Sequence, residues 1–131
     1  MTNTRSDRIN ISSEKHDTYK HLTEGPTSPF KTMKDLFLTS AAIGVEKGIR
    51  KAIEKPTSIF AWSVFTSQED IPFLYALVLS IGEPIDILLE QGKILDLLEE
   101  YANTGIEELE RELLSSTMPS LMLANKILEE S

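Results

Sequence analysis

The chain has 131 residues, a size typical of one domain, and 40% of them are hydrophobic and 26% charged. It contains no cysteine, which excludes disulfide bonds, thiolate zinc sites and a cysteine nucleophile. The net charge of −8 argues against non-specific binding of nucleic acid, because such binding depends on neutralising phosphates.

Export and membrane signals are not visible in the sequence. The first 15 residues carry charges throughout and lack the apolar core of a secretory signal. The longest apolar run, residues 71–81, falls short of the roughly 20 residues that span a bilayer. We therefore expect a cytoplasmic protein that folds as one domain over residues 1–131, with residues 1–6 and the last few frayed.

The charge is unevenly distributed along the chain. Residues 1–55 hold ten Lys and Arg against seven Asp and Glu, a balance of +3. Residues 56–131 hold three against fourteen, a balance of −11. In the simplest interpretation the acidic half is a set of solvated helix faces, but the split also leaves room for a basic face on the N-terminal half.

The N-terminal elements are a strand and two helices. Apolar and polar residues alternate over residues 8–11, which is typical of a short strand. A helix is predicted over residues 13–24, and Gly and Pro then indicate a loop. A second helix is predicted over residues 32–46, because Thr32 can cap it with Asp35 at the capping-box position.

The second half begins with a charged connector over residues 46–58. Residues 59–65 are rich in aromatics and predict a buried extended or single-turn segment. The helix predicted next, over residues 67–81, is apolar on almost every face, so we expect it to be central and covered on most sides. A short helix over residues 84–91 should follow.

The last two predicted helices are amphipathic. The longer one runs over residues 93–116, and the other begins at Pro119. The predicted outer face of the longer helix carries Arg111 and seven acids: Asp96, Glu99, Glu100, Glu107, Glu108, Glu110 and Glu112.

Together these elements predict an all-α domain of five or six helices, with at most one short strand near residues 8–11. The predicted core includes Phe60, Trp62, Leu74 and Leu77.

No residue pattern indicates catalysis or a cofactor. His16 and His21 are five positions apart, whereas two metal ligands on one helix face need a spacing of three or four. No glycine-rich phosphate loop and no GxSxG sequence is present. The carboxylates of residues 107–112 have the pattern of an exposed face rather than of an acid–base pair. We therefore expect a protein that is not an enzyme and holds no metal or cofactor.

The N-terminal elements have the order of a ribbon-helix-helix unit, in which two chains pair their strands into a ribbon that enters the major groove. Arg8 and Asn10 would point outward, and Arg and Asn bind guanine and adenine edges. Lys31 and Lys34 would hold a phosphate at the start of the second helix. These four residues are the candidate nucleic-acid site, and a homodimer would follow. The alternative is an edge strand within one domain, followed by two ordinary helices.

Four stretches of the sequence, residues 25–37, 41–44, 59–72 and 99–106, carry a resemblance to a known family. They include the strings FKTMKDLF and EEYANTGI, and they resemble the small proteins called Dnd-system-associated protein 4. That family is encoded with the bacterial DNA phosphorothioation machinery, which replaces a non-bridging phosphate oxygen with sulfur and couples to a restriction system. It supplies no catalytic residue that can be transferred to this chain.

The resemblance implies a non-catalytic accessory protein of the modification or restriction system, one that binds DNA or a protein of the system. The alternative is an adaptor that binds a protein through its acidic helical face and does not contact nucleic acid. The two strings also have structural interpretations. Phe30 and Met33 could fix the start of the second helix, Tyr101 could bond across the core, and Gly105 could allow a close helix crossing.

Overall fold

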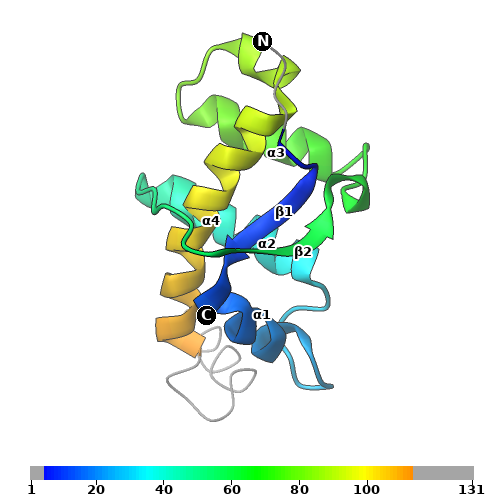
Figure 1. The fold of residues 1–131 in the computed structure, drawn as a ribbon, viewed down its shortest axis with the longest axis vertical. Helices are drawn as coiled ribbons and strands as arrows, with labels where there is room; N and C mark the ends of the chain where they lie inside the picture. Colours follow the sequence, from blue (N-terminus) through cyan, green and yellow to red (C-terminus); the bar gives the residue numbers. More distant parts are fainter. Residues whose placement is uncertain (1–4, 114–131) are drawn as a thin grey trace, which may run out of the picture.

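The computed structural model describes residues 5–113 of the chain (Figure 1). Helix α4 (Gln91–Leu113) runs along the long axis of the molecule, and the strands β1 (Arg8–Ser12) and β2 (Pro56–Ala61) lie beside it. Helix α3 (Asp70–Ser80) lies at the end where α4 begins, and α1 (His16–Thr23) lies where α4 ends.

Helix α2 (Met33–Lys47) begins and ends within one residue of the helix predicted over residues 32–46. The Thr32 hydroxyl accepts the Asp35 N–H (3.1 Å), which satisfies one of the free donors in the first turn. The helix ends at Gly48, whose φ of 69° places it in the left-handed conformation that glycine adopts readily. The predicted cap and the predicted end near Gly48 are both confirmed.

The helices α2 and α4 cross with their backbones in contact. A Cβ atom added to Gly44 would lie 1.9 Å from the Tyr101 carbonyl oxygen, and one added to Gly105 would lie 1.8 Å from the Ser40 carbonyl oxygen. Only glycine therefore fits on either side of the crossing. The close helix crossing expected at Gly105 is confirmed.

The two strands form an antiparallel sheet, with Arg8 opposite Ala61 and Ser12 opposite Pro56. The prediction of at most one strand is therefore wrong, because the end of the expected connector is extended and pairs with β1. This pairing lies within one chain, as in the alternative of an edge strand inside a single domain. A 3-10 turn over Trp62–Val64 follows β2, so residues 59–65 are extended and then form a single turn, as predicted. The predicted burial holds only in part, because Phe60 and Phe65 are buried whereas Val64 is 49% exposed.

Four α-helices lie within residues 5–113, fewer than the five or six predicted. The short helix expected over residues 84–91 is a 3-10 turn, Ile85–Leu89. Its five residues follow Pro84 and end where α4 begins, and short connecting segments commonly take this tighter geometry. The helix predicted to begin at Pro119 lies outside the described residues. The helix-dominated class stands.

The core lies between α2, α4, α1 and the sheet. Among the residues predicted for it, Phe60 and Leu74 are buried, whereas Trp62 and Leu77 are half-buried and pack against its edge. Helix α3 is not central, as its sequence suggested, because Leu74 and Val78 are its only buried residues. It packs through that one face, so no described element covers the other. No helix within the described residues is both long enough and apolar enough to cross a membrane.

Candidate binding surfaces

Arg8 and Asn10 alternate along β1 with two buried isoleucines. Arg8 is exposed, and its Nε donates a hydrogen bond to the Ser58 hydroxyl on β2 (2.6 Å). Asn10 is half-buried, and its backbone N–H donates to the Glu99 carboxylate on α4 (2.7 Å). Arg8 is therefore exposed at the surface of the sheet and Asn10 only partly so, and the backbone of β1 is bonded to α4 on its second edge.

Lys31 and Lys34 lie at the start of α2 in different environments. Lys31 is exposed and forms no ion pair within residues 5–113. Lys34 Nζ lies 2.7 Å from Asp70 Oδ2 on α3, and the same oxygen accepts the Thr66 N–H (2.8 Å). The bond to Asp70 raises the pKa of Lys34, although partial desolvation opposes it. Lys34 thus joins two helices, and a phosphate would have to compete with Asp70 for its charge.

Six cations of the N-terminal half form ion pairs with acids of the C-terminal half. Five of these cations pair with acids of α4, and Lys34 is bonded to α3. The α4 pairs are Arg5–Asp96 (2.5 Å), Arg5–Glu99 (2.9 Å), Lys15–Glu110 (2.9 Å), Arg50–Glu100 (2.9 Å), Lys47–Glu108 (3.5 Å) and Lys51–Glu107. The positive and negative halves of the sequence therefore lie against each other, and most of the basic charge is neutralised within the chain.

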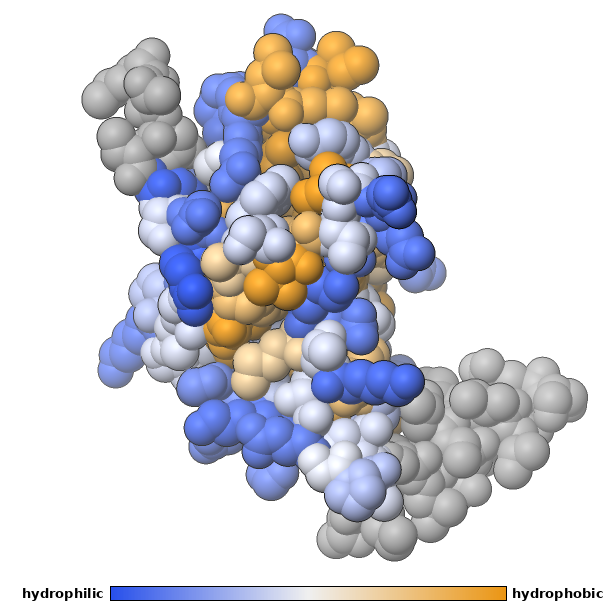
Figure 2. Space-filling view, turned by 90° about the vertical axis from the view of Figure 1, so that its right-hand side faces the viewer, coloured by the Kyte–Doolittle hydropathy of each residue, from blue (hydrophilic) through white to orange (hydrophobic). Residues whose placement is uncertain are grey.

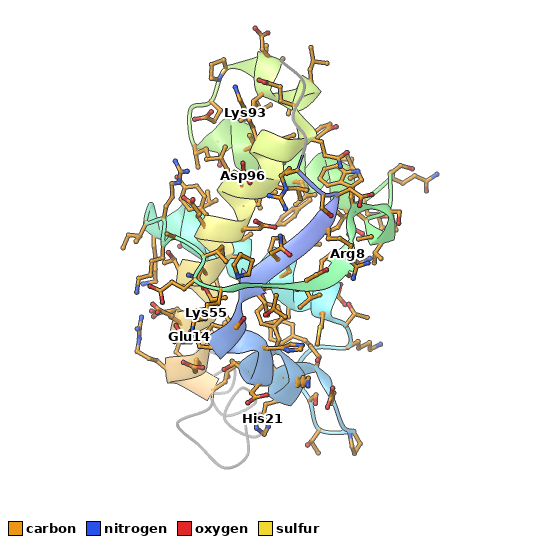
Figure 3. All side chains as sticks on the ribbon, viewed as in Figure 1. Arg8, Glu14, His21, Lys55, Lys93 and Asp96 are labelled. Atoms are coloured by element: carbon orange, nitrogen blue, oxygen red, sulfur yellow. The ribbon has the colours of Figure 1, made fainter. Side chains whose placement is uncertain are left out.

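Four cations of that half form no ion pair with a described residue: Arg8, Lys20, Lys31 and Lys55. They lie on β1, on α1, before α2 and before β2. Arg8 and Lys55 are at opposite ends of the sheet (Figure 3). The structure therefore distributes these charges over four segments.

Glu99 lies inside the molecule, which corrects its predicted place on the outer face of α4. Its side chain is 6% exposed and accepts hydrogen bonds from the Arg5 guanidinium (2.9 Å) and the Asn10 N–H (2.7 Å). Burial raises the pKa of Glu99, and the bonds from Arg5 and Asn10 only partly offset this effect. The helical periodicity missed this residue because β1 packs against a side of α4 that looks polar in sequence.

Three other acids predicted for an adaptor face, Glu100, Glu107 and Glu108, are partly exposed but paired with cations of the same chain. The string EEYANTGI also bonds to the connector that follows α2. The Asn103 amide donates to the Ala52 carbonyl (3.1 Å), and the Thr104 hydroxyl donates to the Ile49 carbonyl (2.8 Å). The described contacts of this string therefore hold the fold together.

The uncovered side of α3 and the turn after it form an apolar surface, which we call the α3 surface. Phe73 and Leu79 are 43% and 38% exposed, and Ile85 and Leu89 are 70% and 88% exposed. Figure 2 shows hydrophobic side chains gathered at this end of the molecule. The apolar run of residues 71–81 was the sequence signal for the α3 part of this surface, but we interpreted it as a sign of burial.

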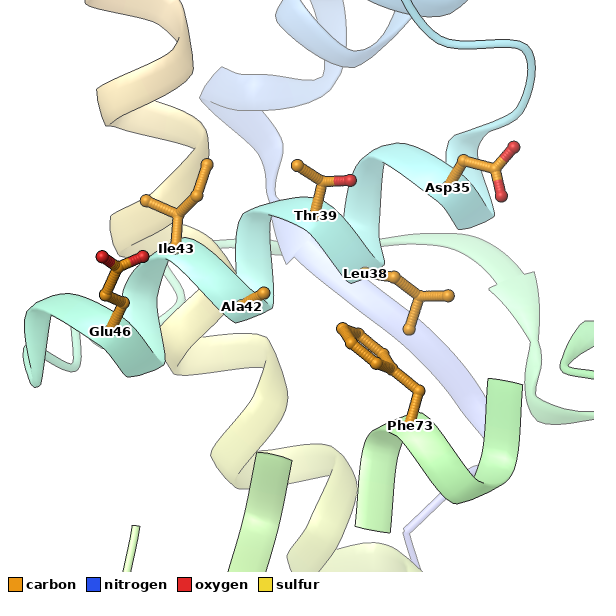
Figure 4. Close-up of a pocket in the computed structure, with 7 residues that line it drawn as sticks. All are labelled: Asp35, Leu38, Thr39, Ala42, Ile43, Glu46 and Phe73. Atoms are coloured by element: carbon orange, nitrogen blue, oxygen red, sulfur yellow. The ribbon is translucent and has the colours of Figure 1, made fainter. Parts of the chain in front are cut away.

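A hollow of about 470 Å³ lies along α2, next to the α3 surface (Figure 4). We call it the α2 trough. Phe73 of α3 forms one wall, and the other lining residues belong to α2: Asp35, Leu38, Thr39, Ala42, Ile43 and Glu46. A smaller hollow of about 360 Å³ shares Ile43 and Glu46 with it and extends to α4. Sequence reasoning did not find this feature, because it depends on how α3 sits against α2.

His16 and His21 lie on α1, and neither belongs to a group of metal ligands among the described residues. Within residues 5–113, no group of three or more His, Asp or Glu side chains is arranged to hold a metal ion. His16 is half-buried and His21 is exposed.

The fold and these surfaces define a small helical protein with a two-stranded antiparallel sheet. A family model described as DNA sulphur modification system-associated protein 4 matches residues 8–131, and the chain belongs to this family. Membership associates the protein with a DNA sulphur modification system, as the resemblance implied. No curated protein and no solved structure shows a significant match to the chain.

Proposed function

We propose that the protein is a non-catalytic accessory subunit of a bacterial DNA sulphur modification system, and that it acts in the cytoplasm by binding another protein of that system. Family membership supplies the system. The observation that favours a protein partner is a contrast between two kinds of surface. Most cations of the N-terminal half are paired within the chain, while large apolar side chains of the α3 surface are open.

This contrast favours a protein partner on physical grounds. Binding to a duplex draws its affinity from cations that neutralise phosphates, and Lys34 would first have to leave Asp70. Contiguous exposed apolar side chains, in contrast, mark sites where another protein excludes water. Residues such as Leu89, 88% exposed, lose their contact with water only when something covers them.

Direct contact with DNA is the second candidate, because Arg8 and Lys31 are exposed and form no ion pair with a described residue. In that case Lys31→Ala should weaken binding to all sequences and reduce the salt dependence by about one unit. Arg8→Ala or Asn10→Ala should instead relax sequence preference, by about 1–3 kcal/mol at one base pair. Both effects should be measured on phosphorothioated and unmodified duplexes.

The test is affinity purification of the tagged protein from a host that carries the system, with nuclease treatment. We expect a protein of the system to be retained after nuclease, and we expect the purified protein to bind no duplex at low salt. A Leu79→Glu/Leu89→Glu variant should lose the partner, because it places two charges on the α3 surface. It should still fold, because both side chains are exposed and do not form part of the core. An Arg8→Ala/Lys31→Ala variant should retain it. Loss of the partner on nuclease treatment, or duplex binding that the Arg8/Lys31 variant lacks, would instead support the DNA candidate.

A further inference from the structure

Most of the α2 trough lies on the side of α2 opposite its crossing with α4, and its Ile43 and Glu46 end adjoins the smaller hollow that reaches α4. Ser40 and Gly44 form the side that crosses α4, whereas Asp35, Thr39 and Glu46 recur at helical spacing on the other side. Part of its lining is apolar, and Phe73 forms one wall (Figure 4). Phe73 also belongs to the α3 surface, so the trough continues the apolar area described above.

The two ends of the trough carry negative charge. Asp35 lies at one end and Glu46 at the other, and both are exposed. Neither carboxylate forms an ion pair with a residue of the described chain. They are eleven positions apart on one helix, which corresponds to about 16 Å, or three turns. The two nearby cations are engaged elsewhere: Lys34 interacts electrostatically with Asp35, but its ammonium is bonded to Asp70 (2.7 Å), and the ammonium of Lys47 is paired with Glu108 (3.5 Å).

We infer that the α2 trough receives an amphipathic helix of the partner protein, with an apolar face flanked by Lys or Arg residues about three turns apart. The inference rests on the proposed function and adds the place and the chemistry of the contact. The apolar face would lie against Leu38, Ile43 and Phe73, as in other helix-in-groove complexes. The cations would meet Asp35 and Glu46, which fixes the position of the helix along the groove.

Charge argues against the two occupants that this chain itself could supply. Residues 114–131 contain one Lys and two Glu, so they bring a net negative charge toward Asp35 and Glu46. A second copy of the chain brings a net charge of −8 and the same two carboxylates. Like charges at an interface oppose association, whereas a cationic helix is attracted to both ends of the trough.

The test places the photocrosslinking residue p-benzoylphenylalanine at position 39, inside the trough, in the full-length protein within its host. Mass spectrometry then identifies the crosslinked segment. A matched control places the same residue at position 21, beside Asp17 and Glu24 of α1, on a different surface. We expect position 39, but not position 21, to crosslink to an amphipathic segment of another protein with Lys or Arg about three turns apart.

The charge contacts are tested with a double variant and a matched control. Asp35→Asn/Glu46→Gln removes the two trough charges, and Asp17→Asn/Glu24→Gln removes the same charges from α1. Asp17 and Asp35 both lie in the first turn of a helix, and Glu24 and Glu46 both lie at a helix end. A synthetic peptide of the crosslinked segment should bind the trough variant about three- to ten-fold more weakly at low salt and the control variant with unchanged affinity.

Three results would overturn the inference while leaving the proposed function intact. They are a crosslink from position 39 to residues 114–131, a crosslink to a second copy, and no crosslink although the partner still co-purifies. Equal peptide affinity for the two double variants would also overturn it, provided that circular dichroism shows both to be folded. If no protein of the system co-purifies at all, the proposed function itself fails.

Discussion

Lys34 was predicted to hold a DNA phosphate, and the structure shows it bonded to Asp70. One substitution cannot separate these two roles. The Lys34 ammonium links α2 to α3, so losing it disturbs the fold as well as any binding. A double-mutant cycle with Lys34→Met and Asp70→Asn should give a coupling energy of about 0.5–1 kcal/mol in urea unfolding, because both groups retain some contact with water. Additive effects of the two substitutions would contradict the structural role. Lys31→Ala is the control, because Lys31 has no ion pair with a described residue.

Glu99 should give the stability of the protein an unusual pH dependence. Burial raises its pKa above the ordinary value of 4.5, against the opposing bonds from Arg5 and Asn10. Between 4.5 and the raised value, the folded state holds a proton that the unfolded state has released. The contribution of Glu99 therefore decreases as the pH rises through this window. The free energy of unfolding of Glu99→Gln, relative to the wild type, should increase with pH above 4.5, as measured by urea denaturation.

Glu110 on the same helix provides the control, because its shift has the opposite sign. Burial raises the pKa of Glu110, but the bonds from Thr18 and Lys15 outweigh it and hold the pKa below 4.5. Its contribution is present above 4.5 and is lost as the pH falls through the lowered value. Relative to the wild type, Glu110→Gln should therefore recover stability in acid. The same pH slope for both variants would show that these two assignments are wrong.

At the scale of elements, the crossing of α2 and α4 predicts that Gly→Ala substitutions there lower the stability of the protein, whereas helix propensity alone would predict an increase. Gly→Ala within a helix normally stabilises by about 0.5–1 kcal/mol. Gly44→Ala and Gly105→Ala should instead destabilise by about 1–3 kcal/mol, because the new methyl group overlaps the backbone of the other helix. Thermal and urea unfolding would measure this effect, and a stabilised variant would refute the contact. Gly48→Ala is the control: nothing lies within 4 Å of the added Cβ, so only the left-handed backbone opposes it.

The sequence predicts elements well where the determinants are local. Thr32, Asp35 and Gly48 mark the ends of α2 within a few residues of the bonds they make. The last residues of β2 lie in the segment predicted as extended or single-turn, but the strand's start and its pairing were missed, because its partner β1 is about 50 positions away and a charged connector gives no local sign of that pairing. The uncovered side of α3 was missed for a related reason. The sequence shows that a helix is apolar, but it does not show whether elements of the same chain or another protein cover its apolar side.

At the scale of the molecule, the charge split along the sequence is not a split in space. The acids of α4 lie against cations from four other parts of the chain, which include Arg5, Lys15 and Arg50. A basic face over residues 1–55 could be expected only if those residues folded apart from the acidic half. The candidate residues Arg8 and Lys31 could be found by type and position, but the partner of Lys34 and the α2 trough depend on α3, which packs there through long-range contacts.

Because residues 1–55 pack against the second half of the chain, this fold differs from a ribbon-helix-helix unit, which folds independently. In such a unit residues 1–55 should fold alone as a dimer, with β1 pairing across the two copies. Here β1 pairs with β2, and α2 packs on α4, so both partners lie outside that fragment. We therefore expect the fragment 1–55 to show the circular dichroism of an unfolded chain and to elute as an expanded monomer. Mixing it with the fragment 56–131 should restore helical signal, because the missing core and the ion-pair partners are then supplied. A folded dimer of the fragment 1–55 by itself would show that the strand can pair between chains, and it would revive the DNA candidate built on Arg8 and Asn10.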